Sequence, residues 1–448
     1  MAKKSTTTFI CSNCGAHHSS WMGKCSVCGE WNTLIEQVSD LGAMSASGKK
    51  LTVIASTEVT SQKMSSRIPS GSQSMDEVLG GGFVKGSVTL LAGQPGIGKS
   101  TLLLQVAYAA AQSVTVLYVS GEESVQQVGM RAARLGAAAA DLSLTSSNSA
   151  DDIAATVASG DYDLVVVDSI QTITVSSVTS AAGSVGQITN SAHLLMSAAK
   201  KSNTALLLVG HVTKEGSIAG PKVLEHVVDV VLQLEGDRYG GFKVLRSVKN
   251  RFGSTNESAI YEMGETGLQP VDNPSAALLA ERQVSDGSVV LATLEGVRPL
   301  LVEVQALVNT TSYGYPKRAA SGIDLNRVNL LIAMLERRTK LQLADKDVYI
   351  NIVGGLKITE PAADLAVCMA IASAAKGMQL KKDAVVFGEV GLSGEVRRVA
   401  FTEKRIAEAQ KLGFVGAIGP PQAKSKAGSF LLPVRDIRTA LNQFLEKD

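Results

Sequence analysis

The chain has 448 residues, 45% of them hydrophobic, and a formal net charge of +2 at pH 7. This length accommodates roughly three domains with buried cores, and so small a net charge provides no bulk electrostatic argument for nucleic-acid binding. Its apolar runs are shorter than the ~18–20 residues of a membrane span, and residues 1–8 lack the apolar segment of a secretion signal. We therefore expect a cytoplasmic protein with no membrane partner.

Four of the five cysteines form two Cys-x2-Cys pairs near the N-terminus. The pairs comprise Cys11, Cys14, Cys25 and Cys28. Four thiolates at this spacing predict a structural Zn²⁺ site in residues 1–38, with iron as the minor alternative and disulfides disfavoured in a reducing compartment. We expect Trp21 and Trp31 to pack over this small zinc ribbon. The spacing leaves open whether the ribbon only stabilises the fold or also contacts DNA or a partner. Residues 39–66 have the composition of a flexible linker.

A phosphate-binding loop follows the linker. Residues 93–101 match G-x-x-x-x-G-K-[ST] in full, between an apolar β-prone run and an apolar helical run. They comprise Gly93, Gln94, Pro95, Gly96, Ile97, Gly98, Lys99, Ser100 and Thr101. Such a loop holds phosphates because its N–H groups and the helix N-terminus surround them, while Lys99 reaches the β- and γ-phosphates and Ser100 offers a hydroxyl group to Mg²⁺. The motif predicts ATP and Mg²⁺ as cofactors.

Residues 67–270 alternate β-prone runs with helical patterns. The expected strands are 114–119, 164–167, 205–209 and 227–234, and the expected helices are 126–135 and 186–201. This alternation predicts an α/β domain with a largely parallel, doubly wound sheet, in which ligands bind at the carboxyl ends of the strands. Candidate active-site residues should therefore directly follow these strands.

Acidic and imidazole side chains do follow three of the predicted strands. Asp168 is interpreted as the Walker B carboxylate, which holds Mg²⁺ through water. Glu122 is favoured as the base that orients or deprotonates the attacking water, with Glu123 as the rival. A helix N-terminus that favours acids would explain both glutamates without catalysis. His211 is interpreted as a γ-phosphate sensor that signals to the loop 212–219, although a lone histidine is usually structural.

Together with the ribbon, the P-loop and the Ser-Gly-Glu-Glu-Ser run at 120–124, a five-residue motif resembles the RadA (Sms) family of bacterial recombination and repair proteins. The motif comprises Lys249, Asn250, Arg251, Phe252 and Gly253. The resemblance implies a RecA-like core and a DNA-dependent ATPase that promotes branch migration as a hexameric ring. It also implies single-stranded and branched DNA and a RecA-type recombinase as partners, and a role for the motif in both ATP use and DNA binding.

Within this motif, Lys249 and Arg251 are two residues apart and should project to the same face of an extended segment. Such a cation pair can reach the γ-phosphate held by a neighbouring subunit, which would make the two side chains trans fingers. A charged turn after the expected strand 242–248 is the structural alternative.

Residues 275–448 have a different pattern, with expected strands at 289–294, 300–308 and 348–353, helices at 326–338 and 402–412, and a hairpin at 387–399. This α+β domain resembles the proteolytic domain of Lon. Residues 360–364 are expected to open a long helix, with Pro361 in its first turn. In Lon-type peptidases the corresponding helix carries a nucleophilic serine just after the proline, and a lysine of the later helix activates this serine. Ala362 occupies the serine position, so that chemistry is excluded whatever Lys404 does. We expect a scaffold for oligomerisation and DNA contact.

Two function classes remain open on sequence grounds. The first is an ATP-driven DNA motor, in which basic residues of the C-terminal domain contact phosphates if they share a face. These residues are Lys340, Lys381, Lys382, Arg397 and Arg398. If they do not share a face, each of them is an ordinary solvated surface residue. The second is an ATP-gated DNA-binding or signalling ring, in which hydrolysis times assembly without moving DNA.

Overall fold

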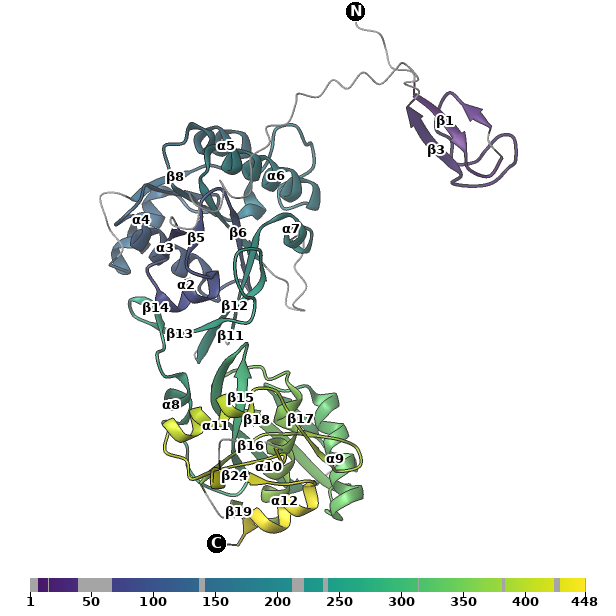
Figure 1. Cartoon of the computed structure of the whole chain (residues 1–448). Helices are drawn as coiled ribbons and strands as arrows, with labels where there is room; N and C mark the ends of the chain where they lie inside the picture. The colour runs from purple at the N-terminus through teal and green to yellow at the C-terminus, as the bar shows by residue number, and fades with distance from the viewer. Residues whose placement is uncertain are drawn as a thin grey trace, which may run out of the picture. The chain divides into compact units, whose positions relative to one another are not determined.

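The computed structural model describes residues 7–14, 16–38, 67–136, 142–211, 221–236, 241–312, 314–380, 383–422 and 428–447. The chain forms two compact units, Met1–Met64 and Ser65–Asp448 (Figure 1). The expected linker 39–66 lies outside the described residues. Among the described helices, none combines the length and the apolar character needed to cross a membrane.

The first unit is a small three-stranded ribbon. Its strands are β1 (Thr7–Cys11), β2 (His17–His18) and β3 (Leu34–Val38), in the order β2-β1-β3. Cys11, Cys25 and Leu34 form its buried cluster. Trp31 packs on the surface of the ribbon as expected, since the Nζ atom of Lys24 lies 5.6 Å from the centroid of its ring, but Trp21 and Trp31 remain 59% and 68% exposed. The physical reason is that the cysteine cluster occupies the interior, so the indole rings are left at the surface.

The domain that carries the P-loop is built on a nine-stranded sheet in the order β14-β13-β12-β11-β6-β10-β9-β7-β8. The parallel strands are β6 (Val88–Gly93), β7 (Val116–Ser120), β8 (Leu142–Ser146), β9 (Leu164–Asp168), β10 (Ala205–His211) and β11 (Val230–Gly236). The antiparallel strands are β12 (Phe242–Asn250), β13 (Ser258–Gly264) and β14 (Gly267–Pro270). The predicted α/β fold class is confirmed. The strand expected from residue 227 begins at Val230, because α7 extends to Val227 and residues 228–229 form a bend.

Helices cover both faces of this sheet (Figure 1). They are α2 (Gln73–Leu79), α3 (Lys99–Ala110), α4 (Val125–Arg134), α5 (Ala150–Ser159), α6 (Val185–Ser202) and α7 (Pro221–Val227), with the 3-10 turn η1 (Ile170–Thr172) and the short pair β4 (Arg67–Ile68) and β5 (Phe83–Val84). Successive residues of β6 point to opposite faces, so Leu90 and Leu91 lie in different hydrophobic cores. Both faces of β6 are therefore buried, which holds the loop that follows it.

The C-terminal domain contains a seven-stranded sheet in the order β17-β18-β16-β15-β20-β23-β24. Its strands are β15 (Ser288–Glu295), β16 (Arg298–Thr310), β17 (Arg318–Ser321), β18 (Lys346–Ile352), β20 (Ala384–Val386), β23 (Gly416–Gly419) and β24 (Leu431–Pro433), with the small pairs β19 (Gln379–Leu380) and β25 (Leu445–Glu446), and β21 (Glu389–Val390) and β22 (Val396–Arg397). Its helices are α8 (Pro274–Leu279), α9 (Leu325–Thr339), α10 (Asp364–Lys376), α11 (Thr402–Lys411) and α12 (Ile437–Phe444), with the 3-10 turns η2 (Pro361–Ala363) and η3 (Gly428–Phe430). The predicted α+β character is confirmed.

A buried ion pair joins three elements of the C-terminal domain. Arg405 of α11 is fully buried and donates to Glu360 at 2.7 Å and to the carbonyl oxygen of Ala292 in β15 at 2.6 Å. Glu360 directly precedes the turn that leads into α10. A buried arginine requires such partners because an unpaired buried charge is very costly. The pair therefore fixes α11 against β15 and the start of α10.

Candidate active site

The P-loop joins β6 to α3. Gly98 is the N-cap of α3, and Gly96 and Gly98 have φ values of +78° and +111°, a backbone region that favours glycine. A Cβ atom at Gly93 would lie 2.7 Å from the carbonyl oxygen of Leu234, which belongs to the backbone and cannot move aside easily. Glycine is thus required both for the backbone conformation and for the close packing of this loop.

Lys99 lies in the loop's interior, where it is 4% exposed. Its Nζ atom donates to the carbonyl oxygens of Gly93 at 2.9 Å and Gln94 at 3.0 Å. Burial lowers the pKa of Lys99 to about 8, even though the charges of Asp168 and Glu122 act to raise it. The predicted lysine and the two predicted carboxylates are therefore close enough to act on one another.

Strand register brings the other predicted residues to the same edge of the sheet. Gly93 in β6 pairs with His211 in β10, and Ser120 in β7 pairs with Asp168 in β9. The start of the P-loop, His211 and Asp168 thus lie at the carboxyl ends of three adjacent parallel strands. This placement is the one expected for a ligand site at the carboxyl ends of a parallel sheet.

Tyr118 is a site residue that sequence reasoning missed. Its hydroxyl group donates a 2.6 Å hydrogen bond to the Oδ2 atom of Asp168. Burial raises the pKa of Tyr118, and the charge of Asp168 raises it further, so the hydroxyl group remains a donor. The only sequence signal is a polar atom inside the apolar run that ends at Ser120. Asp168 is itself 9% exposed and is fixed in place by this bond.

The two neighbouring glutamates face different partners. The Oε1 atom of Glu122 accepts a 2.5 Å hydrogen bond from Ser169 and lies 3.5 Å from the Nε2 atom of His211. Glu123 forms an ion pair with Arg131 of α4. Glu122 therefore lies at the strand ends, and Glu123 is held against α4.

His211 is half-buried beside the P-loop. Burial lowers its pKa, and the charge of Lys99 lowers it further, while Glu122 acts in the opposite direction. The imidazole is therefore neutral at pH 7. The loop 212–219, to which we expect His211 to signal, lies outside the described residues.

Lys249 and Arg251 both contact the segment that connects α7 to β11. The Nζ atom of Lys249 donates to the carbonyl oxygens of Glu225 and Val228, each at 2.7 Å. Carbonyl groups at the C-terminal end of α7, which lack partners within the helix, thereby receive hydrogen bonds. The Nη1 atom of Arg251 lies 3.0 Å from the Oδ1 atom of Asp229. Burial lowers the pKa of Lys249, and the neighbouring charge of Arg251 lowers it further. The two cations thus lie on the same side, as the spacing predicts.

These two cations lie at the end of β6 opposite its P-loop. Asp229 accepts a 3.1 Å hydrogen bond from the N–H group of Val88, the first residue of β6, whereas the P-loop begins at Gly93, the last. With a rise of ~3.3 Å per residue, the two ends of β6 are about 17 Å apart. This distance exceeds the reach of an arginine side chain. Arg251 therefore does not contact phosphates bound to its own P-loop.

The remaining residues of the motif pack against the C-terminal end of α2. The Nδ2 atom of Asn250 donates to the carbonyl oxygens of Val78 at 3.3 Å and Leu79 at 3.1 Å. A Cβ atom at Gly253 would lie 3.0 Å from the Cα atom of Gly80. Phe252 is 36% exposed. These contacts explain Asn250 and Gly253 by packing, and DNA binding by the five-residue motif stays a prediction.

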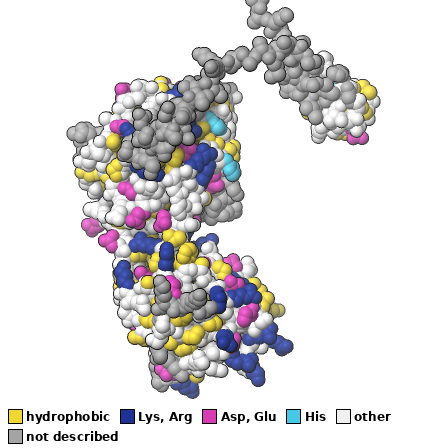
Figure 2. Space-filling model, viewed as in Figure 1, with side chains coloured by type: hydrophobic (Ala, Val, Ile, Leu, Met, Phe, Trp, Pro, Cys, Tyr) yellow, Lys and Arg dark blue, Asp and Glu magenta, His cyan; other side chains and the backbone are white. Residues whose placement is uncertain are grey.

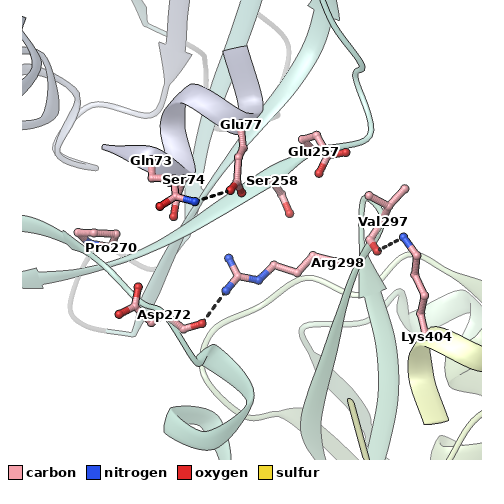
Figure 3. A pocket seen from close by; sticks show the side chains of 10 residues that line it. All are labelled: Gln73, Ser74, Glu77, Glu257, Ser258, Pro270, Asp272, Val297, Arg298 and Lys404. Atoms are coloured by element: carbon pink, nitrogen blue, oxygen red, sulfur yellow. Dashed lines mark hydrogen bonds between the residues drawn. The ribbon is translucent and has the colours of Figure 1, made fainter. Parts of the chain in front are cut away.

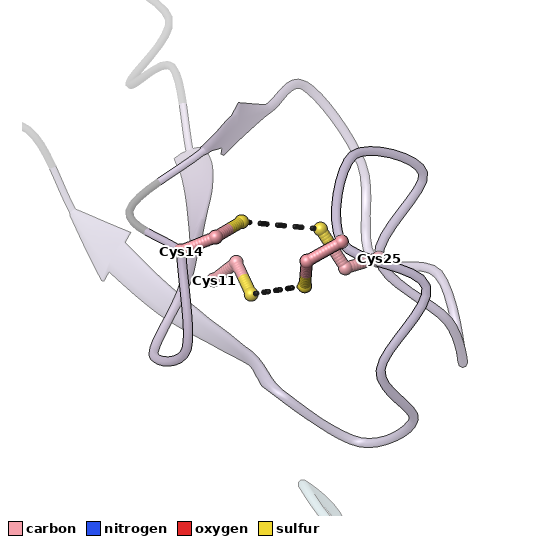
Figure 4. Close-up of side chains that lie close together, drawn as sticks. Cys11, Cys14 and Cys25 are labelled. Carbon is pink, nitrogen blue, oxygen red and sulfur yellow. Dashed lines mark hydrogen bonds between the residues drawn. The ribbon is translucent and has the colours of Figure 1, made fainter.

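The four cysteines of the ribbon converge on one point (Figure 4). Their Sγ atoms all lie within 4.8 Å of one another, with separations of 3.6 Å between Cys11 and Cys28 and 3.7 Å between Cys14 and Cys25. A tetrahedral site with Zn–S bonds of ~2.3 Å has sulfur–sulfur edges of about 3.8 Å. The donor set and its spacing therefore fit Zn²⁺.

The Lon-like domain carries no peptidase dyad at the expected positions. Ala362 is 2% exposed. The Nζ atom of Lys404 donates to the carbonyl oxygen of Val297 at 3.2 Å. Lys404 lines a cavity of about 540 Å³, together with residues such as Glu77 and Arg298 (Figure 3). The lysine is therefore engaged by a backbone carbonyl group, and no serine stands at position 362.

Three family models match the chain. They are an AAA domain over residues 57–217, a rubredoxin metal binding domain over 9–36, and subunit ChlI of Mg-chelatase over 310–423. The first contains the P-loop and the second contains the four cysteines, so the matches agree with the sites described above.

Curated relatives match almost the whole chain. Proteins named DNA repair protein RadA are 47% identical in Brucella abortus (92% of this chain and 91% of the relative), 48% in Bacillus subtilis (93% and 93%) and 44% in Escherichia coli (99% and 99%). The family resemblance carried by the motifs is confirmed. This nearly full-length identity, with a P-loop at a parallel sheet edge and a four-cysteine ribbon, shows that the chain belongs to the RadA family of DNA repair proteins and has an AAA-type ATPase core.

Proposed function

We propose that this chain is a DNA-dependent ATPase that drives branch migration of recombination intermediates as a homohexameric ring moving on single-stranded DNA. The observation that carries the proposal is the position of Lys249 and Arg251 at the end of β6 opposite the P-loop. The side chain of Arg251 is 53% exposed, so most of its N–H donors are available to another molecule. A ring contact would place Arg251 beside the phosphates of the neighbouring subunit, while Lys249, whose Nζ atom is held by carbonyl oxygens at the end of α7, adds positive charge nearby.

Such a contact joins two different surfaces of identical subunits. Repeated head-to-tail contacts of this kind generate a closed ring when the rotation per subunit closes. An ATP site that needs a cation from the next subunit also makes hydrolysis depend on assembly. Both consequences fit a ring-shaped motor better than an independent monomeric ATPase.

Within one subunit, each site residue has a distinct task. Lys99 holds the β- and γ-phosphates, and Ser100 and Asp168 hold Mg²⁺, which neutralises phosphate charge when it is bound. Glu122 orients the attacking water and accepts its proton. His211 lies between Gly93 and Glu122, where it registers whether the γ-phosphate is present.

DNA contact is assigned to the C-terminal domain and to the five-residue motif. Lys and Arg side chains gather over the C-terminal domain on the side of α9 (Figure 2). Lys340 ends α9 and Arg398 is exposed, whereas Arg397 forms ion pairs with Glu389 and Glu395. Lys381 and Lys382 lie outside the described residues. Phosphate contacts of this kind bind DNA without sequence preference. The proposed partners are a RecA-type recombinase and branched DNA, and the proposed location is the cytoplasm.

The test is steady-state ATP hydrolysis by the wild-type chain and the variants Lys249→Ala and Arg251→Ala, each with and without single-stranded DNA. We expect DNA to stimulate the wild type and both substitutions to remove turnover. Arg134→Ala is the matched control, because Arg134 is an exposed cation at the end of α4. Full turnover by Arg251→Ala would contradict the trans contact.

An ATP-gated DNA-binding or signalling ring is the alternative, since the same trans contact would also time assembly. A strand-displacement assay separates the two. ATP turnover that ignores DNA, with no displaced strand, favours the signalling ring. Turnover that rises with DNA, accompanied by displacement, favours the motor.

A further inference from the structure

Asp229 is a buried carboxylate that no motif includes. It lies between the end of α7 and the start of β11 and is 5% exposed. Its Oδ2 atom accepts from the N–H group of Val88 at 3.1 Å, and its Oδ1 atom accepts from the Nη1 atom of Arg251 at 3.0 Å. Both oxygens of this carboxylate are therefore in use.

The backbone of Asp229 contacts the same two residues. Its N–H group donates to the carbonyl oxygen of Val88 at 3.0 Å, and its carbonyl oxygen accepts from the N–H group of Arg251 at 3.2 Å. Main chain and side chain together thus fix Asp229 between the first residue of β6 and Arg251. A residue held at four points has little freedom to change its orientation.

Burial differs sharply across the ion pair. The side chain of Asp229 is 7% exposed, whereas that of Arg251 is 53% exposed. A guanidinium group has five N–H donors in a rigid plane, and Asp229 engages it through one nitrogen. The buried carboxylate therefore orients the group while leaving most of its donors open to solvent.

We propose that Asp229 is the positioning residue that aims Arg251 at the ATP phosphates of the neighbouring subunit. This inference rests on the proposed trans contact of Arg251. The bond to Val88 also ties the arginine to β6, the strand whose other end carries the subunit's own P-loop. One rigid strand thus connects the cation that serves the neighbour with the loop that serves the subunit itself.

The first test is Asp229→Asn, which keeps the size of the side chain but cannot accept hydrogen bonds at both positions. We expect kcat for DNA-stimulated ATP hydrolysis to fall by about ten- to a hundredfold, the range for losing one hydrogen bond between charged groups. KM for ATP should stay unchanged, because the subunit's own P-loop is intact. The double variant Asp229→Asn, Arg251→Ala should be no slower than Arg251→Ala alone.

The second test is complementation between two inactive variants in mixed assemblies. A variant that is inactive only because it folds poorly would not be rescued in this way. Lys99→Ala subunits lack the phosphate lysine but keep Asp229 and Arg251, whereas Asp229→Asn subunits keep Lys99. In mixed assemblies, an intact P-loop lies next to an intact arginine, so turnover should exceed the sum of the two separate variants. Asp161→Asn removes an exposed carboxylate of the same domain and should behave as wild type.

The outcomes separate the two proposals. Wild-type turnover by Asp229→Asn, with an inactive Arg251→Ala, overturns the role of Asp229 and leaves the trans contact standing. Wild-type turnover by Arg251→Ala overturns both. A lowered melting temperature of Asp229→Asn without rescue in mixed assemblies assigns Asp229 to fold stability and overturns the positioning role.

Discussion

The Oε1 atom of Glu122 lies 3.5 Å from the Nε2 atom of His211, although the two residues are 89 positions apart in the chain. Glu122 follows β7 and His211 ends β10. The contact brings the proposed base and the proposed sensor together at the edge where the P-loop begins. It also distinguishes Glu122 from Glu123, whose carboxylate is paired with Arg131.

Replacing Glu122 should abolish turnover while sparing nucleotide binding. A general base contributes about 10²- to 10⁴-fold to a reaction rate, so we expect Glu122→Gln to lose that factor in kcat. Affinity for a fluorescent ATP analogue should change less than threefold, because Lys99 and the loop glycines remain. Steady-state hydrolysis and equilibrium titration measure the two quantities.

Glu123→Gln is the matched control for that variant. Its carboxylate is held by Arg131, so the substitution should lower kcat by less than about tenfold, the loss expected for one surface ion pair. A larger loss of kcat for Glu123→Gln than for Glu122→Gln would reverse the assignment of the base.

ATP affinity should weaken as the pH rises above about 8. In the ligand-free protein, burial lowers the pKa of Lys99 to about 8, and phosphates bind the protonated ammonium group. Above that pKa the apparent dissociation constant should rise about tenfold per pH unit. Titrations with a fluorescent ATP analogue between pH 7 and pH 9.5 measure this slope.

Lys99→Arg is the control for the pH profile. A guanidinium group does not titrate in this range, so this weaker-binding variant should show a flat profile up to pH 9.5.

The free energy of unfolding should change with pH in the direction opposite to ATP affinity. Between pH 8 and about 10.5 the unfolded chain holds the Lys99 proton and the folded chain does not, so this residue's contribution to the free energy of unfolding rises with pH.

Metal removal should unfold the ribbon and leave the ATPase core intact. The ribbon belongs to a compact unit separate from Ser65–Asp448, and its interior consists mainly of the cysteine cluster. We expect one zinc ion per chain, released as four thiols react, while the fully buried Cys368 stays unmodified. Cys28→Ser should lose the zinc without shifting the main thermal transition. A large shift of that transition would contradict this separation.

Breaking the buried Glu360–Arg405 pair should destabilise the C-terminal domain. Glu360→Gln leaves the Arg405 charge buried without a counter-ion, which costs about 3–5 kcal/mol of unfolding free energy. Urea unfolding at pH 7 measures the loss. Glu281→Gln, at an exposed position after α8, is the control and should change the midpoint little.

The effect of Glu360→Gln should also depend on pH. Burial alone would raise the pKa of Glu360, but the hydrogen bonds and charge of Arg405 outweigh burial and lower it below 4.5. A carboxyl group whose pKa is lower in the folded chain stabilises the fold at pH values above its pKa in the unfolded chain, about 4.5. This stabilisation is lost as the pH falls through the pKa of the folded chain. The difference between wild type and variant should therefore shrink on acidification. A constant difference down to pH 3 would contradict the paired state.

Patterns within short stretches of the chain were readable from sequence because their chemistry is local. The P-loop needs consecutive residues around one phosphate site, and the ribbon needs two pairs of cysteines at short spacing. Strand ends identified Asp168, Glu122 and His211 as neighbours, because parallel strands bring their carboxyl ends to one edge. Strand boundaries were less accurate, as at Val230, where helix α7 replaces the expected start of β11.

Contacts between distant segments were decided only by the tertiary structure. Tyr118 was missed because its partner Asp168 lies 50 positions away, and Asp229 was missed because Arg251 and Val88 meet it only in the folded sheet. Trp21 and Trp31 were expected to pack over the ribbon, and both stay largely exposed because cysteines occupy the ribbon's interior. Sequence by itself determined the family, the position of the P-loop and the four-cysteine cluster. Folding determined which end of β6 carries each charge, because strand direction and register are set by long-range packing.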